Sequence, residues 1–125
     1  MALALAFLEP VANAKANAKA KANAKVYNMK AILITFDQSY TERIIDLLTT
    51  NNCRGFSMVE QLQGRGSKTG QPHYGNHAWP SMCSGIISMV DDDKVDIILE
   101  KLHAMDVATE KLGLRAFTWN IEKSI

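Results

Sequence analysis

The residues of this chain most able to do chemistry are gathered in one segment, from Gly64 to Pro80. The segment holds two of the three histidines, one of the two tryptophans, an arginine, a lysine and four of the seven glycines. Long loops without secondary structure of their own are usually functional or disordered, and binding residues are often carried on loops that a rigid frame positions. We therefore expect the function to centre on this segment.

The glycines at the start of the segment are suited to anion binding. Gly64 and Gly66 let backbone N–H groups approach a ligand closely, and Arg65 or Lys68 supplies positive charge beside them. The spacing does not match the phosphate-loop pattern G-x-x-x-x-G-K-[ST]. A flexible turn without a ligand is the alternative interpretation of the same glycines.

The histidines farther along the segment are suited to a soft metal. His73 and His77 are four residues apart, and Cys83 follows. Imidazole and thiolate ligands favour zinc or copper, so these three residues are the candidate metal ligands. Pro72 and Pro80 argue against a helix that would align the two histidines, and solvated or partner-facing histidines are the alternative.

The remaining reactive and aromatic side chains indicate binding rather than catalysis. Tyr74 and Trp79 are candidate contacts for a partner protein, since aromatic residues are enriched at binding hot spots, although Trp79 can equally pin the loop to the sheet. No nucleophile stands beside a base and an orienting third group, so we expect no enzyme. Cys53 and Cys83 have no CxxC spacing and do not make a disulfide framework, which favours two reduced thiols in a cytoplasmic protein.

The flanking sequence predicts the frame that positions this loop. Residues 30–36, 56–62, 85–90 and 114–121 have strand-like patterns, and helical periodicity follows the first and third of them. Ser39 and Glu42 have the spacing of a capping box at the first helix. The acidic run 91–93 would cap the second helix and complement its dipole.

This order of elements, β-α-β-loop-β-α-β, is the ferredoxin-like arrangement. We predict an α+β fold in which a four-stranded antiparallel sheet carries two helices on one face and a long loop joins strands two and three. The other face would bear large apolar groups such as Phe56, Met58, Trp119 or their alternates. An apolar sheet face without helices favours oligomerisation through the sheet.

Residues 1–28 differ in composition from the remainder. They hold four lysines against one glutamate, a net charge of +3, whereas residues 29–125 hold ten basic and twelve acidic residues, a net charge of −2. The Ala/Asn/Lys stretch has no apolar stripe, and the apolar run before Glu9 is too short to span a membrane. We expect a low-complexity extension (a tag, a linker or an upstream start) before a 29–125 domain that binds no nucleic acid and inserts into no membrane.

With these elements in order, the chain resembles a PII-like signalling protein of the nitrogen regulatory PII superfamily. The resemblance covers roughly residues 29–121, and residues 29–32 resemble the first strand of that family. The stretch 64–70 resembles the G-x-G-R-Q-x-G sequence at the base of its loop, and 113–117 weakly resembles its G-x-K-x-F. Ser67 and Lys68 stand where the family has Arg-Gln, which indicates a divergent member.

The resemblance implies a trimer whose long loop, the T-loop of the family, regulates a partner protein such as a transporter or an enzyme. It also implies a small anionic effector in clefts between subunits, with ATP, ADP or AMP as candidates. The effector-binding residues expected on this basis are Gly64, Arg65, Gly66, Lys68 and Arg115. The alternative is a trimeric soft-metal-binding protein similar to the CutA-like proteins, using His73, His77 and Cys83.

Overall fold

The structure is a computed structural model that describes residues 28–66, 68–75 and 82–125. Residues 1–27 of the predicted extension, together with His77 and Trp79, lie outside the described residues. The elements in chain order are β1 (Met29–Asp37), the 3-10 helix η1 (Gln38–Tyr40), α3 (Thr41–Thr50), β2 (Phe56–Leu62), β3 (Cys83–Asp91), α4 (Asp92–Ala108), the 3-10 helix η2 (Glu110–Leu112) and β4 (Arg115–Asn120).

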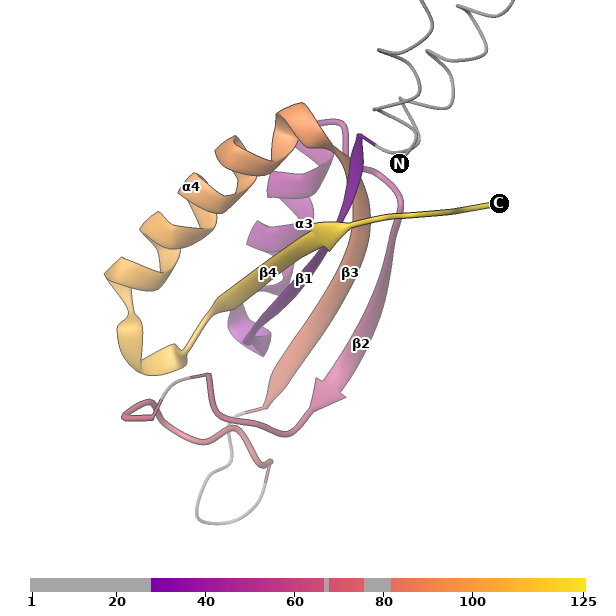
Figure 1. The fold of residues 1–125 in the computed structure, drawn as a ribbon. Helices are drawn as coiled ribbons and strands as arrows, with labels where there is room; N and C mark the ends of the chain where they lie inside the picture. The colour runs from indigo at the N-terminus through magenta and orange to yellow at the C-terminus, as the bar shows by residue number, and fades with distance from the viewer. Residues whose placement is uncertain (1–27, 67, 76–81) are drawn as a thin grey trace, which may run out of the picture.

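The strands form one antiparallel sheet in the order β2-β3-β1-β4. The two central strands, β1 and β3, pair along their whole length, from Met29 opposite Asp91 to Asp37 opposite Cys83. Figure 1 shows both helices on the same side of this sheet and the β2–β3 loop at one end of it. The predicted ferredoxin-like α+β fold is therefore confirmed.

The hydrophobic core lies between the sheet and the two helices. Alternate residues of β1 face the helices, and Ile32 and Ile34 are completely buried there. From the helices, Ile44 of α3 and Ile98 of α4 enter the same cluster. The helical periodicity of the sequence thus predicts the buried faces correctly, because burying those faces against one sheet is what stabilises the helices.

The first helix begins differently from the prediction. The chain enters α3 through η1, and Tyr40 precedes the helix without a side-chain capping bond. The predicted capping box of Ser39 and Glu42 is wrong, because Ser39 lies within the 3-10 turn. Asp37 is the capping residue of that turn: its Oδ1 accepts from the Ser39 N–H at 2.9 Å and from the Ser39 hydroxyl at 2.6 Å. At α4, Asp91 is in the N-cap position but makes no side-chain capping bond.

The sheet face opposite the helices, hereafter the open face, is apolar. Phe56 and Met58 pack against the core on the helix side, so only Trp119 of the three residues named from the sequence belongs to the open face. In the sheet register, Trp119 lies opposite Ala31, which lies opposite Met89. The exposed large side chains of this face are Val59, Met89, Phe117 and Trp119.

No helix among the described residues is long and apolar enough to cross a membrane.

Candidate functional site

The base of the β2–β3 loop folds back on itself. Gly64 and His73 form an antiparallel bridge in which the Gly64 N–H donates to the His73 carbonyl at 3.0 Å and the His73 N–H donates to the Gly64 carbonyl at 2.7 Å. The Gln63 side-chain amide donates to the Tyr74 carbonyl at 2.8 Å. The outgoing and returning segments of the loop base are therefore held together beside the strand ends.

His73 is buried and paired with a carboxylate. Its side chain is 3% exposed, and its Nε2 lies 3.0 Å from Oδ2 of Asp37, the last residue of β1. We assign the proton to Nε2, because an ionised carboxylate can only accept. This placement differs from the solvated histidine considered from the sequence. Asp37 was missed as a site residue, since nothing in the spacing of residues 37 and 73 indicates that they meet.

The loop base also docks on the turn that precedes β4. Gly113 ends η2 in the left-handed conformation, with φ of 66°. Its backbone packs so closely against Gly66 that a Cβ added to Gly66 would collide with the Gly113 carbonyl. The Gln71 N–H donates to the Lys111 carbonyl at 3.1 Å. In Figure 1 the loop accordingly lies beneath the turn that joins α4 to β4.

A partly open cavity of about 220 Å³ lies at the loop base. The residues that line it include Gly64, Arg65, Gly66, His73, Cys83 and Gly113. The structure thus brings three of the five predicted effector residues, Gly64, Arg65 and Gly66, to one site. Two of the three predicted metal ligands, His73 and Cys83, line the same cavity.

Arg115 lies at a neighbouring cavity of about 540 Å³, lined also by Thr69, Gly70, Asp106, Glu110 and Lys111. The Arg115 guanidinium already donates to Oδ2 of Asp106 at 3.1 Å, and to the Leu114 carbonyl at 2.6 Å. The other carboxylate oxygen of Asp106 is buried and has no hydrogen-bond partner among the described residues. An anion at Arg115 must therefore compete with Asp106 for the guanidinium.

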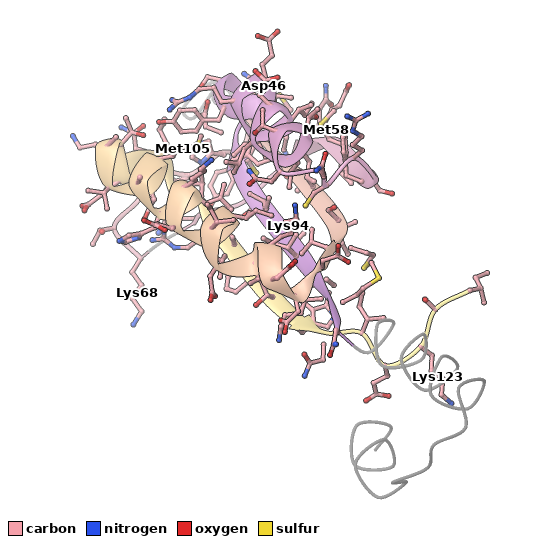
Figure 2. The ribbon with its side chains drawn as sticks, turned by 90° about the horizontal axis from the view of Figure 1, so that it is seen from above. Asp46, Met58, Lys68, Lys94, Met105 and Lys123 are labelled. Atoms are coloured by element: carbon pink, nitrogen blue, oxygen red, sulfur yellow. The ribbon has the colours of Figure 1, made fainter. Side chains whose placement is uncertain are left out.

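Lys68 lies apart from both cavities. It lines neither of them and is exposed, and Figure 2 shows its side chain pointing away from the rest of the protein. Lys68 therefore contributes positive charge near the loop base without lining either cavity.

The described residues do not assemble a metal centre. No group of three or more His, Cys, Asp and Glu side chains is placed to hold an ion among residues 28–66, 68–75 and 82–125. His73 is instead occupied by Asp37, and the Cys83 thiol donates to the Leu62 carbonyl at 3.1 Å.

We expect both cysteines to be unreactive at neutral pH. Burial raises the pKa of the Cys83 thiol, and the negative charge of Asp37 raises it further. Burial likewise raises the pKa of Cys53, with partial compensation from Lys94. Because the thiolate is the nucleophile, iodoacetamide at pH 7.5 should modify each thiol about tenfold more slowly in the folded protein than in the urea-unfolded chain. Mass spectrometry of timed samples checks this, and equal rates in the two states would contradict it.

Comparison with known proteins identifies the fold but no sequence relative. The sequence matches no family model, and it matches no curated protein sequence. Among solved structures, CPII from Thiomonas intermedia K12, a nitrogen regulatory PII-like protein bound to ADP, AMP and bicarbonate, superposes with a TM-score of 0.63 at 22% identity. The match covers 74% of this chain and 85% of CPII.

Two further structures have the same fold. A candidate PII-like signalling protein from Thermus thermophilus has a TM-score of 0.54 at 14% identity, over 74% of this chain and 86% of that one. A DUF3240 family protein from Shewanella baltica has a TM-score of 0.53 at 15% identity, over 78% of this chain and 93% of that one. The chain therefore has the fold of PII-like proteins, and the resemblance inferred from its sequence is confirmed at the level of the fold.

Proposed function

We propose that this chain is a trimeric PII-like regulatory protein that binds a small anionic effector in clefts between subunits. The observation that carries the proposal is the cavity lined by Gly64, Arg65 and Gly66, at which the Gly66 backbone meets Gly113. Glycine backbone and a guanidinium are groups that bind anions, so the presence of both at one cavity supports the proposal. The ADP, AMP and bicarbonate bound to CPII indicate which anions to test.

The trimer is proposed from the open face. Its apolar rows cross β4, β1 and β3, and Phe117 and Trp119 remain about half exposed in a single chain. A contiguous exposed apolar surface marks an interaction site, and packing against further copies would bury it.

A regulatory rather than a catalytic role is proposed, with the 64–80 loop as the surface that contacts the partner protein.

Isothermal titration calorimetry tests the effector. The protein is titrated with ADP, AMP and ATP, each with and without bicarbonate, and we expect heat with at least one of them. Hydrogen bonds to charged groups are worth about 1.5–3 kcal/mol, so Arg65→Ala should weaken the binding by roughly tenfold or more. Lys123→Ala is the control, since Lys123 is an exposed cation that lines neither cavity, and Figure 2 shows it well apart from Lys68. No heat with any ligand would remove the nucleotide from the proposal.

A further inference from the structure

The Asp37–His73 pair connects three parts of the molecule that are distant in sequence. Asp37 ends β1, and its Oδ1 holds the start of η1 through the N–H and hydroxyl of Ser39. Its Oδ2 receives the His73 ring from the returning segment of the loop. Both acceptor oxygens belong to the Asp37 carboxylate. The loop base is therefore attached to a central strand of the sheet through a side chain that Ser39 also holds in place.

The same histidine is part of the cavity wall. His73 lines the cavity, and its backbone N–H and carbonyl pair with Gly64. We therefore expect displacement of the ring from Asp37 to disturb the cavity wall and the Gly64 segment together. Cys83 lies opposite Asp37 in the β1–β3 register and also lines the cavity. Its thiol donates to the Leu62 carbonyl rather than to Asp37, whose Oδ2 is paired with His73.

We propose that the Asp37–His73 pair is a positioning pair, a latch that holds the loop base in the shape that accepts the effector. This inference rests on the proposed function, which identifies the cavity as the effector site. It adds the pair of residues through which effector binding and the structure of the loop base are coupled. Because such coupling is reciprocal, an effector in the cavity also stabilises the latched loop. The buried pair is well suited to hold the loop base, because breaking it leaves a buried carboxylate that has lost one hydrogen-bond donor.

Two substitutions at His73 separate the hydrogen bond from the packing. Gln places an N–H donor near the position of Nε2, whereas Leu fills similar space without a donor. Hydrogen exchange of the Gly64 and His73 amides, which donate to each other's carbonyls, reports the latch without any ligand. We expect exchange at least tenfold faster in His73→Leu, and within threefold of wild type in His73→Gln. Ser39→Ala, which removes one hydroxyl donor to Asp37, should give an intermediate acceleration.

The binding measurement is made on the same variants with ADP. His73→Leu should weaken ADP binding about tenfold, and His73→Gln should restore it to within threefold of wild type. Exchange in His73→Leu equal to that of wild type, or equal acceleration in the Leu and Gln variants, would overturn the latch. Absence of ADP heat with the wild-type protein would instead overturn the proposed effector and its coupling, and the exchange data alone would then decide whether the latch exists. If His73→Leu does not fold, the latch is tested on the other two variants. Amide exchange should then be faster in Ser39→Ala than in His73→Gln, and exchange in Ser39→Ala equal to that of wild type would overturn the latch.

Discussion

Replacement of Gly66 by alanine is expected to detach the loop base from the turn before β4. The new Cβ would collide with the Gly113 carbonyl, which is backbone and cannot rotate away as a side chain does. Overpacking of this kind costs about 1–3 kcal/mol. Because only the loop base depends on the contact, we expect local rather than global loss: faster exchange of the Gly64 and His73 amides, and effector binding weakened at least about tenfold, with the thermal midpoint little changed.

Gly55→Ala is the matched control for this experiment. Gly55 lies just before β2 and does not line the cavity, and nothing lies within 4 Å of the position of its Cβ. Alanine at a compatible loop position is neutral or slightly stabilising, by up to about 1 kcal/mol. Hydrogen exchange and calorimetry on the two variants therefore isolate the Gly66–Gly113 contact. Equal behaviour of the two variants would show that this contact does not hold the loop.

Replacement of Trp119 by glutamate is expected to dissociate the proposed trimer. Trp119 is exposed on the open face, and it lies opposite Ala31 in a row that continues to Met89. Loss of a tryptophan hot spot costs about 2 kcal/mol or more, and burial of an unpaired carboxylate adds to that cost. In a trimer the loss occurs at three interfaces, which weakens assembly by roughly 10⁴-fold. Sedimentation or light scattering should therefore change from three chains per particle to one.

A surface on the opposite side of the molecule provides the control. Val107 of α4 has an exposed fraction of 56%, against 46% for Trp119, but it does not belong to the sheet. Val107→Glu introduces the same charge and should leave the oligomeric state unchanged. A wild-type protein that already sediments as a single chain would contradict the trimer, and it would leave the open face to another kind of partner.

The candidate site illustrates how far sequence patterns reach. Gly64, Arg65 and Gly66 are adjacent in sequence, so their shared location is a local property that a motif can reveal. Asp37 and Asp106 were missed because each becomes part of a site through a residue outside its own element, His73 in one case and Arg115 in the other. The histidine was noticed for its chemistry, but its burial and its partner depend on how the loop returns to the sheet.

The sequence by itself determined the order of strands and helices, the helix faces that are buried and the ferredoxin-like fold, because hydrophobic periodicity is a local signal that reports which side of each element is buried. Tertiary structure alone decided that Phe56 and Met58 face the helices while Trp119 faces outward, since a strand register one residue different would reverse each assignment. It also decided that Gly66 meets Gly113 and that His73 meets Asp37. Such contacts join segments far apart in the chain, and their geometry exists only once the sheet has brought those segments together.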